Sequence, residues 1–235
     1  MDALLEAFEG IWNIRGAFME GALVTLKLFF FTMLFSIPLA LPIALGSDCK
    51  IAPIRWLCRT FIWVFRGTPL MLQLVFFYYF FFPFTLGLPK LSDLFIAIFT
   101  FSLNYAAYLA EIYRAGIGSI DHGQYEAAKS LGISKTRTLF GIILPQTVKR
   151  VLPPVSNEMI TLVKDTALAS CIALSDLFRV VTKQVSARSN PLLYIAPALF
   201  YLIFTFLLTL LTNYLEKKFS FGEKLEARVE RRKKK

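Results

Sequence analysis

The chain has 235 residues and a formal net charge of +10, and 56% of its residues are hydrophobic, including 24 phenylalanines. The apolar residues form long blocks separated by polar breaks, a pattern typical of membrane proteins that argues against a water-soluble fold. The sequence contains one histidine and three cysteines without a CxxC pair, so we expect no metal site.

The apolar blocks predict an all-α, polytopic membrane protein with about five transmembrane helices. We treat residues 1–235 as a single transmembrane domain whose core covers about 20–217. In chain order, the expected spans are 28–45, 56–82, 94–109, 151–174 and 191–215. The third of these, 94–109, is short for a membrane span unless it extends to residue 115.

The second span contains Arg-Gly-Thr-Pro at 66–69. Thr68 can cap a helix and Pro69 is favourable at the first helical position, so a new helix can begin inside the apolar run. Broken helices of this kind line cavities or pivots in transporters. A plain start of the span after an interfacial turn explains the same residues equally well.

The fourth span is the weakest, because it carries Glu158, Lys164 and Asp165. Each charge costs about 2.5–3.5 kcal/mol near the centre of a membrane helix, whereas a large apolar residue returns only about 0.3–0.6 kcal/mol. The segment therefore does not favour lipid by itself. If it spans the membrane, its charged side must face protein or water.

Lysine and arginine in short loops mark the cytoplasmic side. Residues 114–150 contain six of them and the tail after Leu215 contains nine, whereas residues 1–26 contain one. An arrangement with the N-terminus outside and the C-terminus in the cytoplasm places the rich segments inside. Residues 175–190 contradict this orientation, because they would lie outside and yet contain three basic residues. Anchoring at the membrane interface or contact with an extracellular partner would explain them. We expect the basic tail at 216–235 to contact anionic lipid and not nucleic acid.

A long polar segment that ends at Pro145 interrupts the apolar pattern. Asp121 or Gly123 can open a helix, and Gly132 fits the left-handed position that ends it. Ser134 can then cap a second helix, and Pro145 limits how far that helix continues. Two short helices joined at a glycine would form a compact protrusion on the cytoplasmic face.

We refer to residues 121–145 as the knob. Tyr125, Ala128 and Leu131 fall at helical spacing along one side of its first helix, a stripe suited to a groove in another protein. An interfacial helix lying on lipid has the same periodicity, so periodicity alone does not choose between the two.

The knob resembles a known signature. Glu126-Ala127-Ala128, Gly132 and, after nine residues, Ile142-x-Leu144-Pro145 are similar to the EAA signature of permease subunits of bacterial binding-protein-dependent ABC importers. The resemblance covers about 20–217. Three further segments resemble the polar amino acid branch of that family, namely RGTPLMLQL at 66–74, AEIYRAGIGSI at 110–120 and NEMITLVKDT at 157–166.

This resemblance implies a multi-pass permease in the bacterial inner or plasma membrane that dimerises with itself or with a similar chain. It also implies an extracellular or periplasmic solute-binding protein that delivers an amino acid. The chain has no GxxxxGK[ST] phosphate loop, so ATP and magnesium are expected on a separate ATPase dimer and no cofactor on this chain. The residues implied to couple to that ATPase are Glu126, Ala127, Ala128, Leu131, Gly132 and Pro145.

Polar residues inside the spans are candidates for the substrate path. Glu158 and Asp165 are seven residues apart and share nearly one helix face. Asn104, Tyr108 and Glu111 share a face of the third span, and two such faces can line one cavity. There, Glu158 or Asp165 would accept a hydrogen bond from an ammonium group, and Asn104, Tyr108 or Lys164 would donate to a carboxylate.

Packing explains some of these charges equally well, since Lys164 can pair with an acid and Glu111 with Arg114. Two other functions are alternatives. The first is a membrane enzyme that uses Glu158 and Asp165 as an acid–base pair, but the sequence offers it no nucleophile and no set of metal ligands. The second is a sensor or scaffold subunit, which would support no uptake. We therefore expect an import permease without catalytic residues of its own, working by alternating access. The sequence does not select one amino acid substrate.

Overall fold

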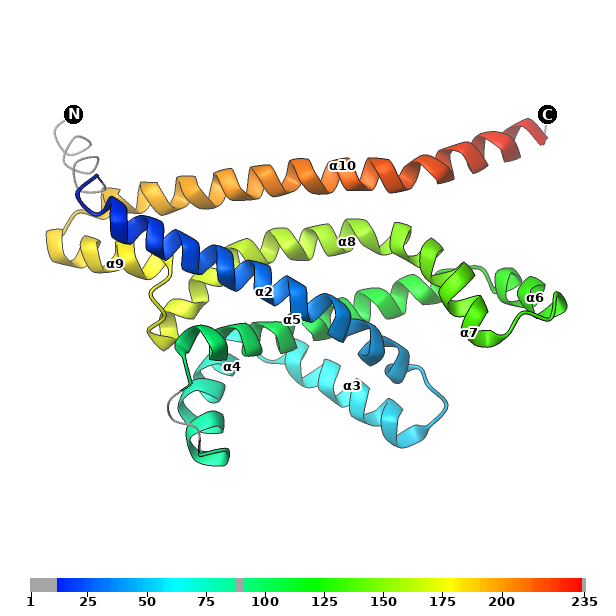
Figure 1. The fold of residues 1–235 in the computed structure, drawn as a ribbon, viewed down its shortest axis with the longest axis horizontal. Helices are drawn as coiled ribbons and strands as arrows, with labels where there is room; N and C mark the ends of the chain where they lie inside the picture. The colour runs from blue at the N-terminus through cyan, green and yellow to red at the C-terminus, as the bar shows by residue number, and fades with distance from the viewer. Residues whose placement is uncertain (1–11, 88–90, 234–235) are drawn as a thin grey trace.

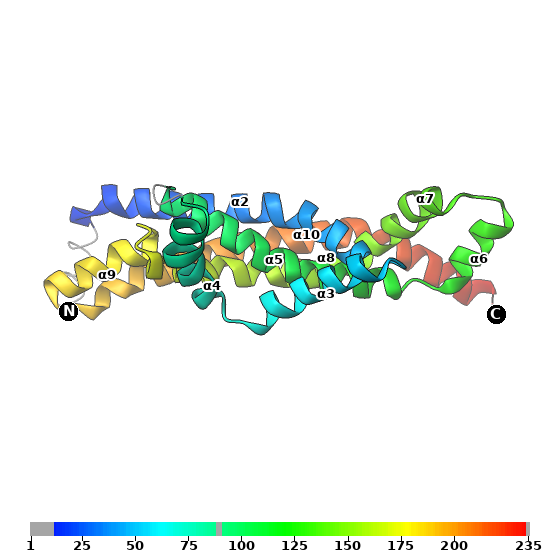
Figure 2. The ribbon, with the colours of Figure 1, turned by 90° about the horizontal axis from the view of Figure 1, so that it is seen from below.

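The computed structural model describes residues 12–87 and 91–233, and within these ranges the chain is built of helices without a strand (Figure 1). The all-α fold class expected from the sequence is confirmed. Figures 1 and 2 show an elongated bundle whose long axis is followed by α2 (Arg15–Ser47), α5 (Asp93–Gly118), α8 (Leu144–Asp165) and α10 (Ile195–Lys233).

Several of these helices have the length and composition of membrane spans. In the described part of the chain, α2, α5 and the segment Pro191–Phe219 qualify individually. Helix α3 (Ala52–Gly67) and the following pair α4 (Leu70–Phe76) and η1 (Phe77–Thr85) qualify together, with a bend of 106° between them. The predicted break at 66–69 is therefore present as a sharp bend between two helices, a geometry that fits both a broken span and a re-entrant segment.

Helix α8 and the short helix η3 (Thr166–Ile172) occupy the place of the fourth expected span. They are not among the helices apolar enough to qualify as a span, as the three charges led us to expect. Helix α8 nevertheless lies along α5 and α10 inside the bundle (Figure 1). A charged helix in a membrane needs protein or water beside its charges, and α5 and α10 supply protein contacts on two sides of α8.

One apolar core joins the long helices. Its buried side chains include Leu28 from α2, Phe101 and Tyr105 from α5, Leu162 from α8 and Leu208 from α10. Other apolar residues of α10 point outward, in the manner of a helix that faces lipid. Leu202, Ile203, Phe206 and Leu207 are all more than half exposed.

Helix α9 (Leu177–Arg188) closes the end of the bundle where α2 begins (Figure 1). Asp176 is buried and accepts hydrogen bonds from the backbone N–H groups of Phe178 and Arg179, at 3.3 and 3.0 Å. The backbone N–H of Leu177 donates to the Thr25 hydroxyl of α2 at 3.2 Å. The capped start of α9 is therefore fixed directly onto α2.

The opposite end of the bundle carries α6 (His122–Ser130) and α7 (Lys135–Thr138) of the knob (Figures 1 and 2). Helix α7 does not end near Pro145. It continues through a π-helical turn, η2 (Leu139–Ile143), directly into α8. The prediction that Pro145 limits the second knob helix is wrong, because the helical run continues past Pro145, which directly follows the π-helical turn η2.

Candidate functional site

The first half of the knob is fixed by its caps. The Asp121 carboxylate accepts a hydrogen bond from the Gly123 N–H at 2.7 Å, as predicted for the start of α6. Gly132 has a φ of +70°, the left-handed conformation predicted for it. The Gly132 N–H donates to the Lys129 carbonyl oxygen and the Ile133 N–H donates to the Ala128 carbonyl oxygen, each at 3.0 Å. This pair of bonds is the Schellman pattern of helix termination.

The exposed surface of the knob differs from the predicted stripe. Leu131 is 78% exposed, whereas Ala128 is 2% exposed and Tyr125 is half-buried. Partial burial raises the pKa of the Tyr125 hydroxyl, which therefore stays neutral. Ala128 is buried, so a smaller exposed set remains for contact with another protein. That set includes Glu126, Ala127, Leu131 and Phe140.

The knob is also tied to the bundle. Arg150 of α8 donates to the backbone carbonyl and the hydroxyl of Ser119, at the end of α5. Gln146 reaches Gln124 of α6 at 3.5 Å. The first contact joins the ends of α5 and α8 that flank the knob, and the second ties α6 to the start of α8.

The helix break at the end of α3 opens onto a polar cavity of about 560 Å³ between α4, α5 and α8. We call it the acidic cavity, because Glu158 and Asp165 both line it. The Tyr105 hydroxyl donates to the Asp165 carboxylate at 2.8 Å and fixes its orientation. Further lining comes from Arg66, Thr68, Asn104, Tyr108 and Thr161.

The break itself is held by two amide side chains. Gln73 Nε2 donates to the Phe65 carbonyl at 2.9 Å and to the Thr68 carbonyl and hydroxyl at 3.1 and 2.8 Å. Asn104 Nδ2 donates to Phe65 O at 3.1 Å and to Gln73 Oε1 at 3.0 Å. These bonds satisfy carbonyl groups that the broken helix leaves without a helical partner.

Thr68 does not cap α4 as predicted. The N-cap position is Pro69, without a side-chain hydrogen bond, and the Thr68 hydroxyl donates back to Val64 O of α3 at 2.8 Å. A residue that precedes proline is pushed into extended backbone, and Thr68 has a φ of −119° and a ψ of 144°. The proline therefore moves the cap position one residue further along the chain.

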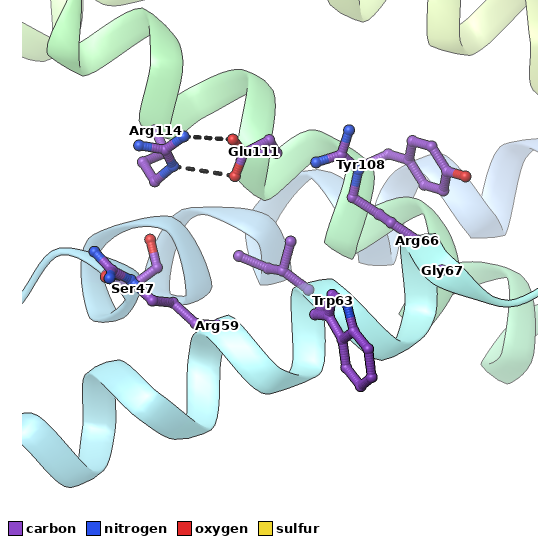
Figure 3. A pocket seen from close by; sticks show the side chains of 9 residues that line it. Ser47, Arg59, Trp63, Arg66, Gly67, Tyr108, Glu111 and Arg114 are labelled. Carbon is purple, nitrogen blue, oxygen red and sulfur yellow. Dashed lines mark hydrogen bonds and ion pairs between the residues drawn. The ribbon is translucent and has the colours of Figure 1, made fainter.

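A second cavity of about 680 Å³ shares Arg66, Gly67 and Tyr108 with the first. Figure 3 shows the side chains that line it. We call it the arginine cavity, since Arg59, Arg66 and Arg114 line it together with Trp63, Tyr108 and Glu111. Arg114 makes a two-bond ion pair with Glu111, as predicted, with Nε to Oε2 at 3.0 Å. Arg66 lies over the Tyr108 ring at 5.3 Å.

The structure brings together four of the six residues predicted for the substrate path, namely Glu158, Asp165, Asn104 and Tyr108. Glu111 lines the arginine cavity instead, and Lys164 is exposed. The sequence reasoning assigned no role to Gln73, Tyr105 or Arg66. Gln73 and Arg66 stand in the RGTPLMLQL segment, and this was the available signal for them.

A helical bundle with a broken span, a charged cavity at the break and a protruding helix pair defines a multi-pass membrane transport protein. Residues 36–221 match the family described as the binding-protein-dependent transport system inner membrane component. The chain belongs to this family of permease subunits, which confirms the resemblance identified in its sequence.

Two permeases of Bacillus subtilis (strain 168) are similar to this chain. The L-cystine transport system permease protein TcyB is 38% identical over 213 residues, which are 89% of this chain and 88% of TcyB. The arginine transport system permease protein ArtQ is 38% identical over 209 residues, which are 85% of this chain and 91% of ArtQ.

Solved structures have the same fold. A chain from the crystal structure of an amino acid ABC transporter with histidines matches with a TM-score of 0.81 and 32% identity, covering 90% of this chain and 98% of that chain. A chain of the MetNI methionine ABC transporter matches with a TM-score of 0.73, covering 88% of this chain and 98% of that chain. Its identity of 17% supports the fold alone.

Proposed function

We propose that this chain forms the translocation path of an ATP-driven amino acid importer, as a dimer with a second copy or a similar permease. The observation that carries the proposal is the acidic cavity, which places Glu158 and Asp165 beside a broken membrane helix. The named relatives support amino acids as the substrate class, because they are permeases for cystine and arginine.

The acidic cavity suits the ammonium group of an amino acid. Carboxylates inside a membrane bundle are costly unless they face partners or water, and an incoming cation supplies such a partner. Tyr105 already donates one hydrogen bond to Asp165, which leaves further acceptor positions for the substrate. Both amide hydrogens of Asn104 are engaged by Phe65 and Gln73, so Asn104 supports the helix break instead of donating to a carboxylate.

We place the knob in the cytoplasm and the N-terminus outside. The knob and the end of α10 lie at the same end of the molecule, and α9 lies at the other (Figure 1). The lysine- and arginine-rich segments 114–150 and 216–235 follow the positive-inside rule in this orientation. The protein would lie in a bacterial cell membrane and receive its substrate from an extracellular or periplasmic binding protein.

The knob is the proposed contact with a separate ATPase dimer that binds ATP and magnesium. Helix α7, the π-turn η2 and α8 follow one another without a gap from Lys135 to Asp165, with Pro153 and Pro154 inside α8. The second half of the knob, from Lys135 onward, and the two cavity carboxylates therefore belong to one helical run. A displacement of the knob by the ATPase reaches Glu158 through the backbone and changes the cavity directly.

The test is amino acid uptake by the complex in lipid vesicles, with its ATPase and its binding protein, screened over L-cystine, L-arginine and L-glutamine. Wild type should accumulate at least one of them in the presence of ATP. Glu158→Gln should reduce this uptake while the amount of assembled complex is unchanged. Equal losses of assembly and uptake would assign Glu158 to packing, and no uptake of any amino acid by wild type would refute the proposed function.

A further inference from the structure

The two cavities share a wall. Arg66, Gly67 and Tyr108 line both the acidic cavity and the arginine cavity. Figure 3 shows the Arg66 side chain reaching from the end of α3 toward Tyr108 of α5. Because Ser47, Arg59 and Arg114 line the arginine cavity near the ends of α2 and α5 that face the knob, it lies between the acidic cavity and the knob end of the bundle.

The three arginines of the second cavity differ in their partners. Arg59 donates through Nε to Ser47 O at 2.8 Å and pairs with Asp48 at 3.2 Å. Arg114 is held by Glu111. Arg66 makes no ion pair or hydrogen bond with the described residues, and its guanidinium lies over the face of the Tyr108 ring.

An arginine in this state is suited to a carboxylate. The planar guanidinium presents paired N–H donors that match the two oxygens of a carboxylate, whereas a cation–π contact uses none of these donors. A carboxylate therefore gives Arg66 hydrogen-bond acceptors that the Tyr108 ring does not provide. The carboxylates of Glu158 and Asp165 line the same cavity as Arg66, so this cavity contains groups of both signs, as an amino acid does.

We propose that Arg66 binds the α-carboxylate of the transported amino acid as it passes from the acidic cavity into the arginine cavity, and that Tyr108 holds the guanidinium when no carboxylate is present. This inference rests on the proposed function and adds to it the group that selects for a free carboxylate. Arg66 then makes the difference between an amino acid and the corresponding amine or amide.

The test measures binding to the purified permease–ATPase complex without the binding protein, because a binding protein would impose its own selectivity. The labelled probe is whichever of L-cystine, L-arginine or L-glutamine is taken up by wild type. Its α-amide and its decarboxylated amine serve as competitors. Wild type should bind the free acid at least about tenfold more tightly than the amide, the scale of a hydrogen-bonded charge pair.

Arg66→Gln should weaken binding of the acid by about tenfold and leave binding of the amide nearly unchanged, so that the preference disappears. Arg66→Lys keeps the charge without the paired donors and should retain part of the preference. Arg55→Gln is the matched control, since Arg55 lies on the same helix, bonds Cys49 O and lines neither cavity.

Two outcomes would overturn the proposal. Arg66→Gln could keep the full preference for the acid, or it could lose acid and amide binding equally with the complex intact. Neither result would refute the proposed function, because that function is tested separately by uptake with the wild-type protein.

Discussion

Replacement of Gly132 tests whether the shape of the knob controls ATPase coupling. Gly132 has a φ of +70°, and a Cβ added there meets no atom within 4 Å, so the penalty for a side chain is conformational and not steric. An L-residue in this left-handed region costs about 1–2 kcal/mol. Such a cost lowers the ratio of correctly turned to misfolded knobs by roughly 5–30-fold.

The expected effects form a series. Gly132→Asn should behave nearly like wild type because asparagine tolerates the left-handed conformation, Gly132→Ala should be impaired, and Gly132→Val should be the most impaired. The assay is ATP hydrolysis by the reconstituted complex, with and without substrate-loaded binding protein, beside the amount of permease inserted. We expect normal insertion and a loss of stimulation.

Gly118→Val is the matched control, since Gly118 also faces open space but has no positive φ. Its stimulation should stay close to that of wild type. If Gly132→Val and Gly132→Asn stimulate ATP hydrolysis equally well, the left-handed turn does not matter for coupling and the reasoning fails.

Three further substitutions test the bundle and the cavity. Gln73→Leu removes three donated hydrogen bonds at the helix break. Because each buried group left without a partner costs about 1–3 kcal/mol, the variant should lower the melting temperature of the detergent-solubilised protein. An unchanged melting temperature would contradict this role of Gln73. Tyr105→Phe removes the 2.8 Å bond to Asp165 and should weaken substrate binding severalfold with assembly intact; unaltered affinity would show that Asp165 is oriented by other groups. Gly21→Ala places a Cβ 3.0 Å from the Leu177 backbone and should increase protease cleavage around α9, whereas wild-type resistance would show that the two helices can separate without loss.

Local rules predicted the parts of the fold that depend on neighbouring residues. The break at 66–69, the Asp121 cap and the left-handed Gly132 follow from what proline, aspartate and glycine do to the adjacent backbone. The pairing of Glu111 with Arg114 is likewise local to one helix.

Tertiary contacts determined what the sequence did not reveal. Gln73 and Asn104 meet across 31 residues of chain, so no spacing rule connects them. Ala128 lies on the predicted stripe, but it is buried in the folded chain. Pro145 was expected to stop a helix, and a π-turn just before it lets the helix continue.

Helices α7, η2 and α8 follow one another without a gap, so the second half of the knob and Glu158 lie on one continuous stretch of helix. In the proposed importer, a displacement of the knob would reach Glu158 along this backbone, and the π-turn at Leu139–Ile143 sets the rotational phase between the two ends. Deleting or adding one residue in that turn would rotate every cavity-lining group of α8 by about 100° relative to the knob. Chimaeric permeases with exchanged knobs should therefore keep their cargo only when the length of this turn is preserved.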